Sequence, residues 1–202
     1  MTRLALLITT AALLAVPALA SAQPGIAVPY TLAERHGIFA GGGLWAGNIS
    51  CDGADCGDFR EAGGANGHIG YLFAPNLGLI LDVWAMTSEQ NDVAITFVAA
   101  TVGARFWLAP WLWVQGGIGS GHAEVRVGNF GARGDDVPAG ELAAGIELIR
   151  GPSFALDLQI KGAVGKSTED NGDVTTGRMG GIGVSMTWFA HRHYAPVLAA
   201  SR

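Results

Sequence analysis

Apolar and polar residues alternate one by one over residues 154–164, which read Phe-Ala-Leu-Asp-Leu-Gln-Ile-Lys-Gly-Ala-Val. The even positions are apolar except for Gly162, and the odd positions include Asp157, Gln159 and Lys161. A period of two puts successive side chains on opposite faces of a β-strand. The stretch has about the length that a tilted strand needs to cross a bilayer. We therefore expect a strand with one apolar and one polar face.

Seven further segments show a similar alternation and are bounded by turn signals or polar stretches. They cover 37–47, 61–73, 77–87, 93–108, a segment that starts near Trp111, 139–149 and 178–189. Short turns are predicted at 74–76, 109–110 and 150–152, and longer polar loops at 48–60, 88–92, 122–138 and 165–177. Short turns on one side and longer loops on the other are typical of transmembrane barrels. The sequence thus predicts an all-β fold, an eight-stranded antiparallel up-and-down transmembrane β-barrel.

The N-terminus has the layout of a secretory signal peptide. A mostly apolar run over 4–16 precedes Pro17, and small residues follow at the two positions that signal peptidase reads, Ala20 and Ala22. We expect cleavage after Ala22; an uncleaved membrane anchor is the alternative, for which the run is short. The predicted organisation is a cleaved signal peptide (1–22), a periplasmic lead-in (23–36), one barrel domain (37–189) and a periplasmic tail (190–202).

Composition supports a membrane barrel over a soluble globule. The chain has 31 glycines, only 14% charged residues and a mean hydropathy of +0.33. Its net charge of −5 and the lack of a basic cluster argue against nucleic acid as a partner. A membrane-spanning helix over 62–81, which has no charged residue, is the alternative. Five glycines and Pro75 in that window make a helix the poorer interpretation.

Two cysteines, Cys51 and Cys56, lie in the first predicted loop, and after export we expect them to form a small disulfide hairpin. Metal binding by two cysteines alone lacks further ligands. Two acidic stretches are candidate Ca²⁺ or Mg²⁺ sites: Asp52, Asp55 and Asp58, and Asp170, Asn171 and Asp173. Neither has the spacing of an EF-hand loop, so we expect solvated loops, no metal and no cofactor.

The polar faces of the strands would meet in the lumen. The expected lumen residues are Asn66, His68, Asp82, Arg105, Gln115, Glu141, Glu147, Asp157, Gln159 and Lys161. Eight strands enclose an interior that side chains fill. We therefore predict a polar plug of paired charges, with one layer around Arg105; a narrow proton or ion path is the alternative. An outward aromatic girdle is expected from Tyr71, Phe73, Phe106, Phe154 and Trp188.

Three stretches resemble a known family. They are Phe-Ala-Pro-Asn-Leu-Gly at 73–78, Trp-Leu-Trp-Val-Gln-Gly-Gly-Ile-Gly at 111–119, and a last strand with Gly183, Met186, Trp188 and Phe189. With the leader, they make the chain similar to small eight-stranded outer-membrane barrels of the OmpA, OmpX and OmpW kind over about 37–189. The resemblance implies a bacterial outer-membrane location. It also implies lipopolysaccharide and outer-membrane lipid as surroundings, and an assembly machinery that recognises the last strand. The family's terminal signal usually ends the chain, whereas residues 190–202 follow it here.

Three functions are compatible with these patterns. The first is a non-enzymatic outer-membrane barrel with a structural role, or one that presents loops to an unknown surface ligand. The second is an outer-membrane hydrolase, because Ser120, His122 and Glu124 alternate on one face of a strand. The outer-membrane lipid A deacylases are similar barrels with a lipid-facing His and Ser two residues apart, but their order is His-x-Ser where this chain has Ser-x-His. Residues two apart along a strand are also about 6.6 Å apart, which is long for a hydrogen bond. The third function is that of a soluble, exported lipocalin-like ligand-binding barrel.

Overall fold

The computed structural model describes residues 35–52, 60–90, 92–128, 130–151, 153–168 and 174–190. The strands are β1 (Gly37–Asp52), β2 (Arg60–Ala74), β3 (Leu77–Gln90), β4 (Val93–Ala109), β5 (Leu112–Val127), β6 (Phe130–Arg133), β7 (Val137–Arg150), β8 (Phe154–Thr168) and β9 (Val174–Phe189). Within these residues no helix is long and apolar enough to cross a membrane.

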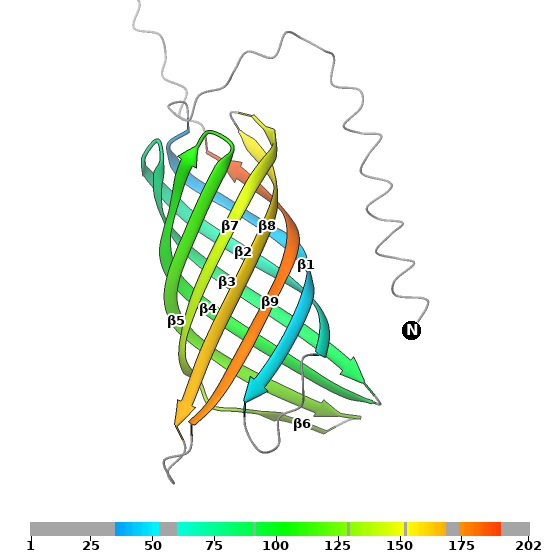
Figure 1. Ribbon diagram of the computed structural model, residues 1–202. Helices are drawn as coiled ribbons and strands as arrows, with labels where there is room; N and C mark the ends of the chain where they lie inside the picture. Colours follow the sequence, from blue (N-terminus) through cyan, green and yellow to red (C-terminus); the bar gives the residue numbers. More distant parts are fainter. Residues whose placement is uncertain are drawn as a thin grey trace, which may run out of the picture.

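Eight of the strands form a closed antiparallel barrel in chain order (Figure 1). Each pairs with its neighbours along the chain, and β9 returns to pair with β1 from Phe39↔Phe189 to Asp52↔Thr176. The remaining strand, β6, pairs with the far end of β5. The predicted eight-stranded up-and-down barrel is therefore confirmed. Closure matters because it leaves no unpaired sheet edge inside a membrane.

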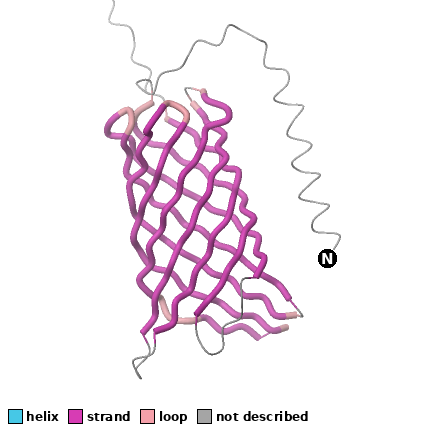
Figure 2. Tube along the Cα trace, viewed as in Figure 1, coloured by secondary structure: helices cyan, strands magenta, loops and turns pink. Residues whose placement is uncertain are grey.

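The two ends of the barrel differ (Figure 2). The turn end holds the tight connections after β2, β4 and β7, together with the start of β1 and the end of β9. Each tight connection lies beside an irregularity in the ladder, at Leu72/Ala74, Trp107/Ala109 and Glu147/Ile149. One extra residue in a strand increases its local twist, which helps the chain to turn back within two or three residues. The opposite end is called the loop end below.

At the loop end the strands run further than the alternation of apolar residues predicted. The expected loop at 88–92 is a tight turn between Gln90 and Val93, with Asp92 at a φ of 64°. The expected loop at 122–138 is largely a hairpin of β5 and β6 with Gly128 at a φ of 56°. The loops at 48–60 and 165–177 are also shortened by their flanking strands. Backbone pairing continues beyond the apolar band because hydrogen bonds do not require lipid, whereas the apolar alternation does.

The outer surface of the barrel is apolar on every strand that closes it. Exposed side chains include Leu44, Ile69, Leu81, Val102, Ile118, Leu142, Ile160 and Ile182, one from each of the eight closing strands. A water-soluble barrel buries such residues, because soluble proteins rarely expose a continuous apolar surface of this extent. The apolar exterior therefore excludes the soluble lipocalin-like alternative.

Many glycines make room for inward aromatic rings. Trp113 pairs with Gly145 across β5 and β7, and Trp45 pairs with Gly183 across β1 and β9. A Cβ atom at Gly145 would overlap the Trp113 indole, and one at Gly183 would lie 2.6 Å from the Trp45 ring. In a narrow barrel a large ring can thus lie over a bare backbone on the next strand, which accounts for part of the chain's high glycine content.

An arginine on the lipid-facing surface tests this assignment of the faces. We expect Ile160→Arg to lower the free energy of unfolding by about 2–4 kcal/mol, because the charge enters the middle of the apolar band. Val164→Arg, on the same face but closer to the loop end, should cost about 0–1 kcal/mol. Equilibrium urea unfolding in lipid vesicles measures both, and equal costs would contradict the assignment.

Candidate functional site

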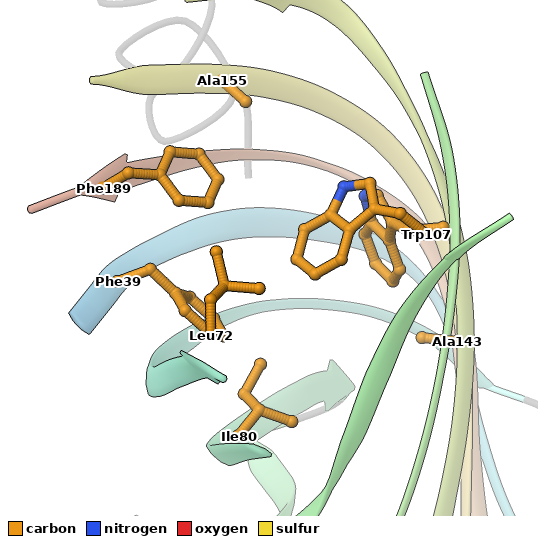
Figure 3. Close-up of a cluster of buried hydrophobic side chains, with 8 residues drawn as sticks. Phe39, Leu72, Ile80, Trp107, Ala143, Ala155 and Phe189 are labelled. Carbon is orange, nitrogen blue, oxygen red and sulfur yellow. The ribbon is translucent and has the colours of Figure 1, made fainter. Parts of the chain in front are cut away.

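The lumen is filled by three layers of side chains. At the turn end lies an apolar turn-side cluster, shown in Figure 3: Phe39, Leu72, Ile80, Trp107, Trp113, Ala143, Ala155 and Phe189. Towards the loop end lies a loop-side cluster: Trp45, Ile49, Ala62, Trp84, Met86, Ala99, Ala163 and Met179. Between them lies a polar network. The lumen thus has a polar layer between two apolar clusters, each of which contains inward aromatic side chains.

All ten side chains predicted to face the lumen are buried inside the barrel. At the centre, Lys161 Nζ lies 2.8 Å from Asp82 Oδ2 and 3.7 Å from Glu141 Oε2. The side chains of Lys161 and Asp82 are each only 1% exposed. Asn66 Nδ2 also donates to Asp82 Oδ2, at 3.2 Å. A buried ammonium is stable here because two carboxylates compensate the loss of its hydration.

Tryptophans connect this ion pair to the loop-side cluster. Lys161 Nζ lies 5.4 Å from the Trp45 ring centroid and 5.3 Å from that of Trp84. Trp45 Nε1 donates to Asn66 Oδ1 at 2.9 Å. Indoles suit this boundary because they combine a large apolar surface with a single donor and an attractive ring face for cations.

Gln115 links the central carboxylates to Arg105. Its Nε2 donates to Glu141 Oε1 at 2.6 Å, and its Oε1 accepts from Arg105 Nε at 3.0 Å. The Arg105 guanidinium lies 4.0 Å from the Trp113 ring centroid, and Trp113 Nε1 donates to Asp157 Oδ1 at 3.1 Å. Besides these contacts, Arg105 lies 5.9 Å from the Phe39 ring centroid and 6.0 Å from that of Trp107, whereas Asp82 pairs with Lys161 and Glu147 pairs with Arg35. The layer of acids around Arg105 stays a prediction.

Glu147 forms an ion pair with Arg35 at the turn end, which the sequence pattern did not reveal. Arg35 Nη1 lies 2.7 Å and 2.8 Å from the two Glu147 carboxylate oxygens, and Trp107 Nε1 donates to Oε1 at 2.8 Å. Arg35 also donates to the Gly151 carbonyl and lies over the Phe189 ring at 4.3 Å. Arg35 belongs to the predicted lead-in, and its side chain is buried at the turn end. Nothing in the period-two pattern identifies it, because it precedes the first strand.

The remaining predicted lumen residues lie beside this network. His68 Nε2 is 3.1 Å from Thr187 Oγ1, and its Nδ1 is 3.5 Å from Asn66 Nδ2. Gln159 is buried on β8, opposite Gly145 and Gly183. The residues described so far come from β2, β3, β4, β5, β7 and β8, and β1 adds Trp45 while β9 adds Thr187. All eight closing strands therefore contribute side chains to the network.

The candidate hydrolase residues form a different arrangement on the outer face near the loop end. His122 Nε2 lies 3.3 Å from Glu124 Oε1, and His122 Nδ1 lies 3.2 Å from Asp136 Oδ1. Arg133 Nη2 donates to Asp136 at 2.9 Å and lies 3.3 Å from the same His122 nitrogen. Both imidazole nitrogens thus have partners other than Ser120 within 3.3 Å. We call His122, Glu124, Arg133 and Asp136 the hairpin clasp.

Other predicted site residues are placed as follows. Trp188 is exposed and Phe189 is buried at the end of β9, while Gly183 lies under Trp45 and Met186 is half-buried. In the predicted girdle, Tyr71, Phe73 and Phe106 are exposed near the turn end, and Phe154 is half-buried.

Some predictions fall outside the described residues. Ala20, Ala22, Cys56 and the tail from 191 onward lie there, so the cleavage site, the disulfide of Cys51 and the role of the tail stay predictions. Among the residues that are described, no group of three His, Cys, Asp or Glu residues has the arrangement of a metal site.

Comparison with known proteins identifies the fold. No family model and no curated protein sequence matches the chain. The crystal structure of Neisserial surface protein A matches with a TM-score of 0.59 and 11% identity over 76% of this chain and 97% of that one. Ail, the attachment invasion locus protein of Yersinia pestis, matches with a TM-score of 0.47 and 17% identity over 74% and 99%. Pseudomonas aeruginosa OprG matches with a TM-score of 0.41 and 12% identity over 81% and 100%. The chain has the fold of small bacterial outer-membrane barrels.

Loss of the central cation tests the polar network. We expect Lys161→Met to lower the free energy of unfolding by about 3–5 kcal/mol, because Asp82 keeps a buried charge without its cation. Adding Asp82→Asn should restore much of that loss. Lys166→Met, an exposed change on the same strand, should stay within about 0.5 kcal/mol of wild type in the same urea unfolding measurement. A negligible effect of Lys161→Met would contradict a buried ion pair.

Acid should release the hairpin clasp. The hydrogen bond from Arg133, together with the charges of Arg133 and His122, lowers the pKa of Asp136. A carboxylate with a lowered pKa stabilises the folded form above its ordinary pKa of about 3.9, and this contribution is lost as the pH falls through the lowered value. Amide protection factors of β6 should therefore be higher at pH 6 than at pH 3. In Asp136→Asn, the protection factors of β6 should be as low at pH 6 as at pH 3. Equal protection of the wild-type protein at the two pH values would contradict the role of the clasp.

Proposed function

We propose that this outer-membrane β-barrel is a non-enzymatic protein that keeps its lumen closed and presents a rigid extension of its sheet to partners outside the cell. The observation that carries the proposal is the continuation of β3, β4 and β5 past the apolar band, together with β6. On the outward face of β5, Ile118 is followed by Ser120, His122, Glu124 and Arg126, so the surface becomes polar while the strand continues to Val127.

The extension has two unlike faces. Cross-strand pairing aligns Val125 with Ala132 and Val127 with Phe130, and the phenyl ring is 86% exposed. The opposite face carries Glu124, Arg126 and Arg133. An exposed apolar face on a rigid sheet outside the membrane is a favourable docking surface for a protein partner, because it offers apolar area at little cost in conformational entropy.

The hairpin clasp supports a fixed presentation. Beyond the four side chains of the clasp, Gly134 N donates to the Ala123 carbonyl at 2.8 Å, and Gly128 N donates to that of Asp92 at 3.4 Å. The first contact lies within the β5–β6 hairpin, and the second joins the hairpin to the neighbouring β3–β4 turn. The same clasp argues against hydrolysis, because it removes His122 from any role as the base for Ser120.

Lipopolysaccharide is the proposed surrounding lipid at the loop end. Lys166 and Arg178 are exposed on adjacent strands, and each is two residues along its strand from the partner of the other in the β8–β9 ladder. Cations at this height suit the phosphate groups of an anionic outer leaflet. The assembly machinery of the membrane is likewise proposed to recognise the end of β9.

Cells that produce the protein provide the test of its surface role. We expect them to adhere to surfaces coated with at least one of a panel of extracellular-matrix and serum proteins. Phe130→Ser should reduce that adhesion at least fivefold, because it removes the apolar anchor. Arg126→Gln, on the charged face of the same hairpin, serves as the matched control and should leave adhesion unchanged.

Two outcomes would count against the proposal. The first is adhesion no greater than that of cells without the protein, with protease access confirming that the hairpin is displayed. The second is a loss of acyl mass from lipid A that depends on the wild-type protein and disappears in Ser120→Ala, which would establish the hydrolase instead.

A further inference from the structure

A cavity of about 300 Å³ lies in the lumen on the loop-end side of the loop-side cluster. Its inward-facing walls come from β4, β5, β7, β8 and β9, with Phe97, Ala99, Gly121, Ala139, Ala163 and Met179 among the lining residues. The space exists because small residues on four strands face Phe97 and Met179. Elsewhere in the lumen, tryptophans and charged side chains fill the equivalent positions.

The cavity is closed on the side facing the middle of the barrel. Ala99, Ala163 and Met179 belong both to its lining and to the loop-side cluster, so they form a shared floor. In that cluster, Trp45 and Trp84 pack against each other at 5.1 Å between ring centroids and cover Lys161. A molecule that enters the cavity therefore meets packed indoles and an ion-paired layer. It would be retained there rather than passed through the barrel.

The lining favours an uncharged ligand. Apart from the clasped His122, the charged residues among its lining in the described part of the chain are Asp135 and Arg178, and both are exposed. The deeper walls consist of alanine, glycine, valine, methionine and phenylalanine. A charged group placed there would lose its hydration without a partner, whereas an apolar group would gain by leaving water.

We propose that this cavity is a binding site for a small uncharged molecule with one or two aromatic rings, taken up from outside the cell. An apolar cavity of about 150 Å³ holds a benzene molecule, so this cavity has room for a substituted ring or a fused pair. Phe97 supplies a ring for stacking or edge contact, and the adjacent Gly177 lets it lie against β9: a Cβ at Gly177 would be 2.6 Å from Phe97 Cε1.

Methionine methyl groups give a direct readout. Met179 lines the cavity and Met86 packs in the floor cluster, while Met186 lies on β9 close to the turn end. We would titrate para-xylene into the ¹³C-methyl-methionine-labelled protein in lipid nanodiscs. The Met179 resonance should shift and saturate as for a single site, whereas Met186 should change only in proportion to the xylene dissolved in the lipid.

Filling the cavity should abolish the site. Ala139→Leu, on an inward wall, should weaken binding at least tenfold, and Ala99→Val provides a second filling variant from β4. Ala104→Leu, on the lipid-facing side of β4, is the matched control and should bind as wild type does. Heat-modifiable migration on gels and an unchanged Met186 resonance show that each variant is folded.

Several results would overturn the proposal. One is a Met179 shift that never saturates and parallels that of Met186. Another is unchanged affinity in both filled variants. A third is broadening of Met179 by a nitroxide at the end of a lipid acyl chain, which would mean that membrane lipid occupies the cavity.

Discussion

The closed backbone ladder is the constraint on which the rest of the structure depends. Within a bilayer, no water is available for unpaired N–H and C=O groups, so β1 must pair with β9 as completely as every other neighbouring pair does. Closure with eight strands leaves a narrow interior that side chains have to fill. The inward positions therefore carry large rings where the opposite residue is glycine, as for Trp113 over Gly145, and long polar side chains where partners converge.

The order of the layers in the lumen follows from the cost of burying charge. Lys161, Asp82 and Glu141 lie in the middle, and apolar clusters lie on both sides of them. Tryptophans at the two boundaries, Trp45 and Trp113, donate hydrogen bonds to the polar layer and pack their rings against apolar neighbours. Arg35 and Glu147 repeat this solution at the turn end. A buried ion pair is tolerated because each charge compensates the other for the loss of hydration. Removing one partner would leave an uncompensated charge in a medium of low dielectric constant.

The loop end combines a rigid exterior with an unfilled interior. The hairpin clasp ties His122 and Arg133 to acidic partners on the outside, while alanine and glycine leave a cavity on the inside. Both features lie beyond the polar layer, so they need no passage through the barrel. A surface-interaction role and a small-molecule site can therefore coexist in a lumen that is blocked from the middle of the barrel to the turn end.

The amino-acid sequence alone determined the number of closing strands, the tight turns and the face of nearly every residue, because lipid on one side and a lumen on the other impose an alternation of period two. On β8, for example, the apolar Leu158 and Ile160 are exposed on the outer face, whereas the polar Asp157 and Gln159 are buried in the lumen. Only the tertiary structure decided the strand ends at the loop end, where pairing continues after the apolar alternation has stopped. It also decided the partners of each charge: Glu147 binds Arg35 across 112 residues, and Lys161 binds Asp82 across 79. Distances between strands depend on register around the closed barrel, which no local pattern encodes. The cavity likewise depends on the register, because the space beside Phe97 is left by small residues that lie on separate strands.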